Sequence, residues 1–139
     1  MRNFVKERVL IVEDDCFVAM LLSLMLEEIG FEICGTAVSE DDAVNAAIQH
    51  QPQLVISDFH LARGDGVSAC ERIQHMVDVP VLFVSGNSDE VRELVPEAIC
   101  VDKPYTLATI KHGILAVLAS RESCTSANPI VEVEAVPLG

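Results

Sequence analysis

Five short, largely apolar runs restrict most strongly how this chain can fold. They lie at residues 9–12, 31–37, 54–57, 79–86 and 98–101. Runs of this kind without a polar alternation are typical of strands buried on both faces of a parallel sheet. Segments with helical spacing follow them, at residues 16–29, 40–50, 67–77, 88–95 and 107–120. The alternation predicts an α/β fold: a doubly wound five-stranded parallel sheet flanked by five helices and joined by right-handed crossovers.

Local signals support two of the predicted helices. Segment 16–29 carries apolar residues at steps of one, three and four, a spacing that predicts a helix; they are Phe17, Val18, Leu21, Leu22, Met25, Leu26 and Ile29. Gly30 follows at the position where a C-terminal cap needs a residue that tolerates φ > 0. Ser39 precedes the helix at 40–50 and is a favourable N-cap residue.

Length and charge limit the possible partners. A chain of 139 residues suits one domain, which we expect to span residues 1–120. The net charge of −13 and the pI near 4.5 argue against nucleic acid and against anionic membrane surfaces as partners. Anything that binds this chain is expected to bring basic groups or apolar contacts.

The cysteines and the N-terminus favour a cytoplasmic protein. The five cysteines are odd in number and widely spaced, without a Cys-x-x-Cys pair, which argues against a disulfide framework or a zinc site. No apolar run is long enough for a signal peptide or for a membrane span. Residues 121–139 break the pattern and are expected to form a flexible tail. The alternating stretch 131–134 leaves open that this tail pairs as an edge strand.

Polar side chains stand where the predicted strands end. Glu13 and Asp14 follow the first strand, Asp58 the third and Lys103 the fifth, and Ser85 ends the fourth. A doubly wound parallel sheet brings these ends to one edge, where such folds bind ligands. Three carboxylates suit a hard cation with oxygen ligands, and Mg²⁺ fits best because it also accepts phosphate oxygens. The three carboxylates are then balanced by Mg²⁺ together with the ammonium of Lys103.

This arrangement would allow Asp58 to act as a nucleophile toward phosphorus. Attack by a carboxylate oxygen yields an aspartyl-phosphate. Mg²⁺ and Lys103 would offset charge on the equatorial oxygens, and Ser85 could donate a hydrogen bond to one of them. Positioning and charge compensation then supply the reactivity.

At these residues the chain resembles the receiver domain of two-component response regulators, the CheY-like family. The resemblance is carried by VEDD after the first strand, SDFHLARGDG after the third, VSG at the fourth and DKP after the fifth. It implies the flavodoxin-like (βα)5 fold with strand order 2-1-3-4-5. It also implies that Asp58 accepts phosphate from the phosphohistidine of a sensor histidine kinase.

The resemblance further assigns a role to each polar residue of this edge. Asp14, Asp58 and the backbone carbonyl of His60 would ligate Mg²⁺, and Glu13 would act through water. Ser85 and Lys103 would hold the phosphoryl group. Asp15 would lie just outside this set, at the N-terminus of the first helix, where negative charge is favourable.

Two features depart from the common family pattern. The aromatic residue expected three positions before the lysine is replaced by Cys100. The interval from Ser85 to Lys103 is short, so the helix within it must be short as well. Both features, with KPYTLATI at 103–110, resemble the FAT GUY subgroup, whose motif is Lys-Pro-Phe-x-Phe-Ala-Thr-Gly-Tyr. This subgroup is associated with sensor kinases of the HWE type, although Ile110 replaces the glycine of the motif.

The sequence therefore predicts a stand-alone response regulator. It would be a non-enzymatic phosphoacceptor, monomeric or weakly dimeric, that signals by binding a downstream protein or acts as a phosphate sink. Two alternatives stay open. One is a receiver-like interaction module that works without phosphorylation. The other is a Mg²⁺-dependent phosphohydrolase with an aspartyl nucleophile; haloacid-dehalogenase-type enzymes, however, require a second Asp where this chain has His60.

Overall fold

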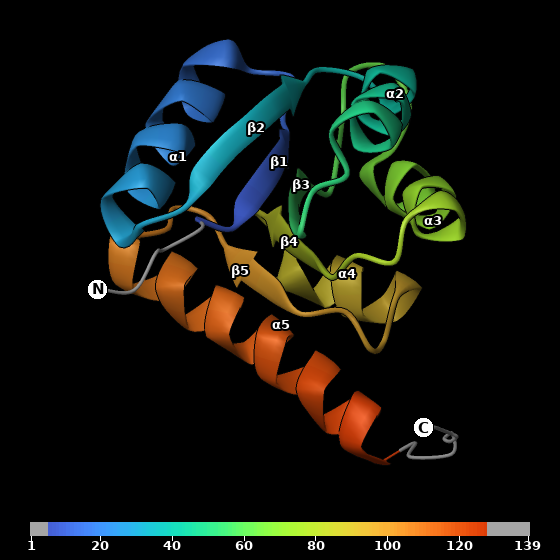
Figure 1. Ribbon diagram of the computed structural model, residues 1–139. Coiled ribbons are helices and arrows are strands. Elements are labelled where there is room, and N and C mark those ends of the chain that lie inside the picture. The colour runs from blue at the N-terminus through green and yellow to red at the C-terminus, as the bar shows by residue number, and fades with distance from the viewer. Residues whose placement is uncertain (1–5, 128–139) are drawn as a thin grey trace.

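The chain folds into a three-layer α/β structure. The computed structural model describes residues 6–127, with side chains through Ser120 (Figure 1). The elements in chain order are β1 (Arg8–Val12), α1 (Cys16–Ile29), β2 (Glu32–Ala37), α2 (Glu40–His50), β3 (Leu54–Asp58), α3 (Gly66–Met76), β4 (Val81–Ser85), α4 (Ser88–Leu94), β5 (Cys100–Asp102) and α5 (Leu107–Ala127). The strands pair in parallel in the order β2-β1-β3-β4-β5. This confirms the predicted fold class and strand order.

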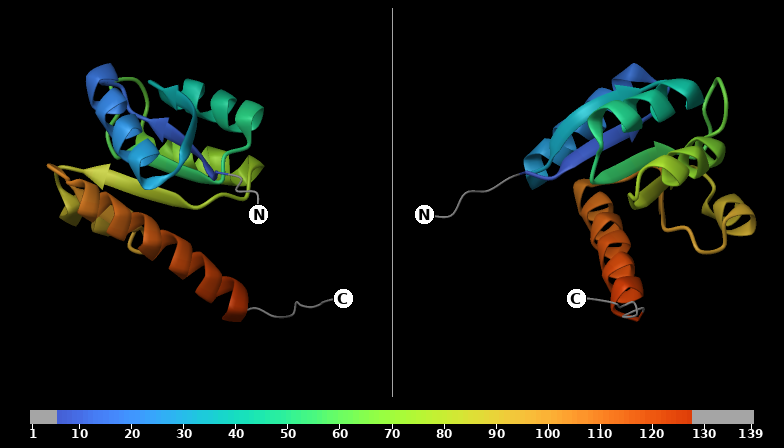
Figure 2. Two further views of the ribbon diagram at one scale, coloured as in Figure 1. Left: turned by 60° about the vertical axis from the view of Figure 1, so that its left-hand side comes forward. Right: turned by 45° about the vertical axis from the view of Figure 1, so that its right-hand side comes forward.

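The sheet separates two hydrophobic cores. Helices α1 and α5 cover one face, and α2, α3 and α4 cover the other (Figures 1 and 2). Strand β1 contributes side chains to both cores. Val9 and Ile11 pack into the core under α1 and α5, whereas Leu10 and Val12 pack into the core under α2 and α3. Successive side chains of a strand point to opposite faces, so a strand buried on both sides must be apolar throughout.

Side-chain caps fix where the helices begin. Ser39 accepts a hydrogen bond from the backbone N–H of Asp42, and Gly30 ends α1 with φ of 117°, as the sequence predicts. Asp65 and Asn87 cap α3 and α4 in the same way. The three N-caps, Ser39, Asp65 and Asn87, each satisfy a backbone donor that the first helical turn leaves free.

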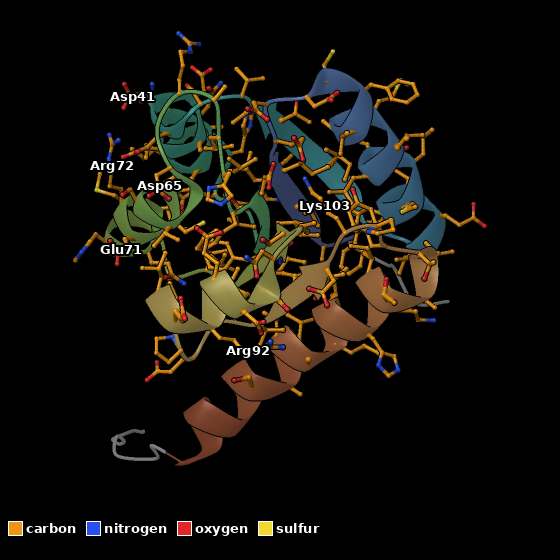
Figure 3. The ribbon with its side chains drawn as sticks, turned by 180° about the vertical axis from the view of Figure 1, so that it is seen from behind. Asp41, Asp65, Glu71, Arg72, Arg92 and Lys103 are labelled. Carbon is orange, nitrogen blue, oxygen red and sulfur yellow. The ribbon has the colours of Figure 1, made fainter. Side chains whose placement is uncertain are left out.

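Arg72 of α3 reaches the carboxylates of Glu40 and Asp41 on α2, at the rim of the molecule (Figure 3).

Most predicted boundaries shift by one or two residues, and the fifth strand and the last helix show why. The fifth strand covers Cys100–Asp102 rather than residues 98–101, because the Ala98 N–H bonds back to Val95 in the turn that follows α4. Helix α5 continues to Ala127 rather than ending near Ser120. No Gly or Pro occurs in the sequence between Gly113 and Pro129, so no strong stop signal precedes the observed end. The rest of the predicted tail, with its alternating stretch at 131–134, lies outside the described residues.

The buried face of α1 is narrow. Ala19, Leu22 and Leu26 are buried against the sheet, but Phe17 and Leu21 are exposed. The predicted helix at 16–29 is confirmed as α1, which is apolar on nearly every side. Helical spacing alone then fits more than one buried face.

Among residues 6–127, no helix is long and apolar enough to cross a membrane.

Candidate functional site

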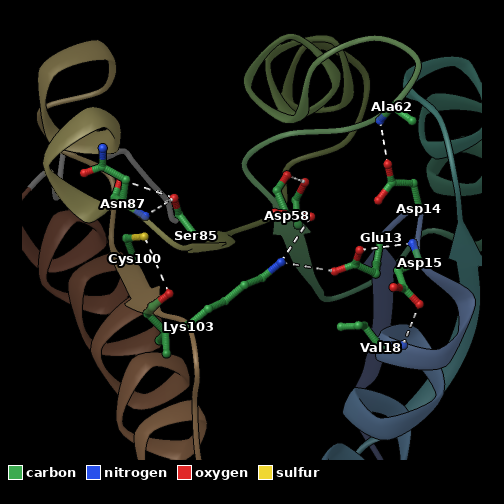
Figure 4. A network of polar contacts seen from close by, with 12 residues as sticks. Glu13, Asp14, Asp15, Val18, Asp58, Ala62, Ser85, Asn87, Cys100 and Lys103 are labelled. Atoms are coloured by element: carbon green, nitrogen blue, oxygen red, sulfur yellow. Dashed lines mark hydrogen bonds and ion pairs between the residues drawn. The ribbon is translucent and has the colours of Figure 1, made fainter.

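The C-terminal ends of β1, β3, β4 and β5 bring five polar residues to one edge of the sheet, as the sequence predicts (Figure 4). They are Glu13, Asp14, Asp58, Ser85 and Lys103. Parallel pairing makes this convergence unavoidable, because all the strands end at the same edge. A backbone hydrogen bond from the Lys103 N–H to the Ser85 carbonyl, 2.9 Å long, fixes the register of the last two of these residues.

Lys103 joins two carboxylates at the centre of the site. Its Nζ lies 3.3 Å from Oδ2 of Asp58 and 3.8 Å from Oε1 of Glu13. Both carboxylates are largely buried, while the lysine side chain is one-third exposed. Poor hydration strengthens this attraction but also makes each charge costly to bury. One ammonium therefore compensates two acids, and the site keeps an excess of negative charge.

This arrangement disfavours the ionisation of Glu13. Burial raises its pKa to about 7, and the negative charge of Asp58 acts in the same direction. A hydrogen bond from the backbone N–H of Asp15 and the charge of Lys103 oppose this increase in pKa. The carboxylate is thus held where ionisation is unfavourable without additional positive charge.

Asp14 and Asp15 have separate structural tasks. Oδ2 of Asp14 accepts a hydrogen bond of 2.6 Å from the Ala62 N–H and so ties the β3–α3 loop to β1. Oδ1 of Asp15 accepts from the backbone N–H groups of Phe17 and Val18 and caps α1. This confirms that Asp15 is a helix-end charge. The run Glu13–Asp15 therefore divides into two residues that face the site and one that begins a helix.

The donor set fits a hard divalent cation. One carboxylate oxygen from each of Glu13, Asp14 and Asp58 lies within 4.8 Å of the other two. These donors are all oxygens, which Mg²⁺ and Ca²⁺ prefer and which soft metals disfavour. Together with the excess negative charge around Lys103, they form an acidic cluster suited to Mg²⁺. The role of the His60 carbonyl as a further ligand remains a prediction.

Ser85 is buried, and its hydroxyl is already engaged. Its Oγ accepts a hydrogen bond of 2.9 Å from the Asn87 N–H and contacts the Asn87 carbonyl at 3.2 Å. Asn87 in turn caps α4 through its Oδ1, which accepts from the Glu90 N–H. Helix α4 has seven residues, as short as the spacing in the sequence requires, and Val91 is its buried residue. The hydroxyl thus supports the turn that leads into α4.

Sequence reasoning missed a contact between α4 and the β3–α3 loop. Nε2 of His60 lies 2.8 Å from Oε1 of Glu90. The two residues stand 30 positions apart, and no local pattern pairs them.

Cys100, at the position of the missing aromatic residue, is half-buried, and burial raises the pKa of its thiol to about 11. A thiol with this pKa stays protonated at neutral pH.

Comparison with known proteins decides the family. Residues 9–114 match the response regulator receiver domain. The chain belongs to this family. The match includes the four strand ends that form the acidic site, so the receiver domain accounts for the fold and the site together. Receiver domains act in two-component signalling, and this chain shares their CheY-like fold.

Curated relatives share the receiver part of longer proteins. The chain is 36% identical to the transcriptional regulatory protein PdtaR of Mycobacterium tuberculosis over 125 residues, covering 85% of this chain and 60% of PdtaR. It is 39% identical over 83 residues to a protein-glutamate methylesterase/protein-glutamine glutaminase of Geobacter metallireducens, covering 59% of this chain and 24% of that protein. The receiver domain therefore spans only part of each relative.

Solved structures agree on the fold. The response regulator PhyR from Brucella abortus superposes with a TM-score of 0.76 at 29% identity, covering 88% of this chain and 52% of that one. The receiver domain of PhyR from Erythrobacter litoralis gives a TM-score of 0.75 at 32% identity, covering 81% of this chain and 90% of that domain. A CheX-CheY-BeF3-Mg²⁺ complex from Borrelia burgdorferi gives 0.72 at 25% identity, covering 81% and 89%.

Proposed function

We propose that Asp58 accepts a phosphoryl group from the phosphohistidine of a sensor histidine kinase, in a reaction that requires Mg²⁺. One observation carries the proposal. The Asp58 carboxylate contacts the ammonium of Lys103 and lies close to Glu13 and Asp14, and one oxygen from each of the three acids is spaced for one cation. A nucleophile, a fixed positive charge and a place for a mobile positive charge are the parts that phosphoryl transfer requires.

The chemical step follows from these positions. A carboxylate oxygen of Asp58 attacks phosphorus as the bond from phosphorus to the imidazole nitrogen breaks, and the bonding electron pair stays on the nitrogen. The product is an aspartyl-phosphate and a free histidine. Lys103 lies 3.3 Å from Asp58 and offsets negative charge that builds on the phosphoryl oxygens.

Four residues would hold the metal in this proposal. Asp14, Asp58 and the backbone carbonyl of His60 would be direct ligands, and Glu13 would act through water. The bound cation supplies charge neutralisation for the transferring group. It would also compensate the carboxylate of Glu13, whose pKa is raised by burial.

Ser85 would connect the reaction to the surface. To donate to a phosphoryl oxygen, its hydroxyl must give up the hydrogen bond that it donates to the carbonyl of Asn87, the residue that caps α4. The short α4 segment would then change its position or its order. A ligand can shift such an equilibrium only by its differential affinity for the two states. In the KPYTLATI segment, the likeness to the FAT GUY motif favours a kinase of the HWE type as the donor.

Incubation with acetyl phosphate and Mg²⁺ tests the proposal. Intact-mass spectrometry should show one phosphoryl adduct, stable in acid and labile in base. The Asp58→Asn variant should lose the adduct, and the matched control Asp42→Asn, at an exposed position of α2, should keep it. Chelation of Mg²⁺ should abolish the adduct in the wild type and in Asp42→Asn.

The same experiment separates the two alternatives. Continuous release of inorganic phosphate without an accumulating adduct would favour the phosphohydrolase. Absence of an adduct and of turnover, both with acetyl phosphate and with a phosphorylated histidine kinase, would favour the interaction module that works without phosphorylation. Either result would refute the proposed function.

A further inference from the structure

The loop between β3 and α3, residues 59–65, borders the acidic site. On the side of the site, the backbone N–H of Ala62 donates to Oδ2 of Asp14 at 2.6 Å (Figure 4). The loop is also closed on itself by a backbone bridge between His60 and Asp65. In the proposed function its His60 carbonyl is a metal ligand. The conformation of the loop therefore decides where this carbonyl lies and how the carboxylate of Asp14 is held.

Glu40 holds the other side of this loop from the first position of α2. Its Oε1 accepts a hydrogen bond of 3.2 Å from the backbone N–H of Asp65. Its own backbone N–H donates to the carbonyl of Arg63, also at 3.2 Å. Gly64 lies between these two loop residues and packs directly on Glu40, since a Cβ atom added to Gly64 would lie 2.5 Å from the Cβ of Glu40. Three consecutive loop residues thus contact one residue of α2.

The carboxylate of Glu40 is itself held in place by Arg72 of α3. Nη1 of Arg72 lies 2.9 Å from Oε2 of Glu40 and 3.0 Å from Oδ1 of Asp41, at the rim that Figure 3 shows. The side chain of Glu40 is 21% exposed, whereas that of Asp41 is 83% exposed. One oxygen of Glu40 therefore serves the guanidinium while the other serves the loop. A charge-assisted contact of this kind keeps the second oxygen directed at the Asp65 N–H.

We propose that Glu40 is a positioning residue for the metal site, because it fixes the β3–α3 loop that carries His60 and contacts Asp14. A loop that is already ordered loses less conformational entropy when it binds a ligand, so its affinity is higher. Groups that orient metal ligands without touching the metal typically contribute about 10–100-fold to metal affinity. The inference rests on the proposed function, since it concerns the same Mg²⁺ site.

Two other effects of Glu40 have to be separated from positioning. Its negative charge attracts a cation from a distance, and an acid in the first turn favours the helix N-terminus. Asp41 has both properties and the same partner, Arg72, but among the described residues it makes no hydrogen bond to the loop. Asp41→Ala is therefore the matched control. Glu40→Gln removes the charge but keeps an amide oxygen that can accept from the Asp65 N–H.

The first test measures Mg²⁺ affinity by isothermal titration calorimetry. Glu40→Ala should weaken binding about tenfold, the lower end of the range for groups that orient metal ligands. Glu40→Gln should stay close to the wild type, because the contact with the loop is kept. Asp41→Ala should also stay close to the wild type. Urea unfolding checks that each variant is fully folded under the conditions of the titration.

The second test follows amide hydrogen exchange in the ¹⁵N-labelled protein without metal. Glu40→Ala should speed the exchange of the Ala62 and Asp65 amides, because the loop is released from α2 and its bond to Asp14 weakens. The same amides should exchange at the wild-type rate in Asp41→Ala. A general loss of stability would instead speed exchange throughout the core strands.

Three results would overturn the inference. Wild-type Mg²⁺ affinity in Glu40→Ala would show that the loop does not need this contact. Equal loss of affinity in Glu40→Gln and Glu40→Ala would show that Glu40 acts through its charge alone. Equal loss in Asp41→Ala would show that the first turn of α2, and not its contact with the loop, supports binding.

The acetyl phosphate adduct separates this inference from the proposed function. Mg²⁺ binding that depends on Glu40, in a wild type that forms no adduct from either phosphodonor, would refute the proposed function and leave the positioning role intact. An adduct in the wild type, with unchanged Mg²⁺ affinity in Glu40→Ala, would refute the positioning role alone. A wild type that binds no Mg²⁺ would overturn both.

Discussion

Replacing Gly66 by alanine should destabilise the protein although the position opens a helix. Gly66 is buried at the first position of α3, immediately behind the end of β3. A Cβ atom added there would lie 2.1 Å from the carbonyl oxygen of Asp58 and 2.9 Å from that of Phe59. Both are backbone atoms, so no side-chain rotation can relieve the overlap. The helix and the strand that carries Asp58 would have to move apart.

The two opposing effects differ in size. Helix propensity favours alanine over glycine by at most about 1 kcal/mol. Overpacking in a well-packed core costs about 1–3 kcal/mol, and a clash between backbone atoms lies at the upper end of this range. We expect a net loss of about 2 kcal/mol in the free energy of unfolding. This corresponds to roughly 1 M in the urea midpoint and to several degrees in Tm.

Urea unfolding followed by circular dichroism measures this loss. Gly86→Ala is the matched control, because a Cβ at Gly86 meets nothing within 4 Å and its midpoint should stay close to that of the wild type. Gly66→Ala should also slow adduct formation from acetyl phosphate, because Asp58 is displaced. A midpoint equal to that of the control would refute the argument that close contact behind β3 positions the acceptor.

Three further predictions concern the site and its surroundings. Asp14→Asn should weaken Mg²⁺ binding at least tenfold by calorimetry. Asp15→Asn should change Mg²⁺ binding little, because Asn caps a helix about as well as Asp. Equal loss of affinity in the two variants would mean that Asp14 is wrongly assigned as the metal ligand. Lys103→Gln should slow adduct formation more than tenfold while the protein still folds, and an unchanged rate would remove its proposed role. Iodoacetamide should label exposed Cys16 at pH 8 but Cys100 only as the pH approaches about 11, read by peptide mass spectrometry; prompt labelling of Cys100 at pH 8 would contradict its burial.

The sequence was sufficient for features that local chemistry or strand order determines. Gly30 and Ser39 end and begin helices because their own side chains, or the lack of one, suit a cap. Glu13, Asp58 and Lys103 meet because each stands at the C-terminal end of a strand of one parallel sheet. No long-range information was needed beyond the order of the strands.

Other features depend on contacts between distant residues and could not be read from the sequence. The register of β5 follows from pairing with β4, which joins Phe83 to Cys100. The outward side of α1 could not be assigned because either side of the helix is apolar enough to be buried. His60 and Glu90 meet only because the β3–α3 loop and α4 lie side by side in the fold.

The hydrogen bonds between Ser85 and Asn87 have a thermodynamic consequence. In the proposed reaction, the Asn87 backbone is an internal competitor for the hydroxyl that a phosphoryl group needs. A hydrogen bond of this kind contributes about 1 kcal/mol, which corresponds to a factor of roughly five in an equilibrium constant. The turn before α4 therefore sets a threshold: the more stable it is, the tighter a phosphoryl group must bind before the surface of the protein responds.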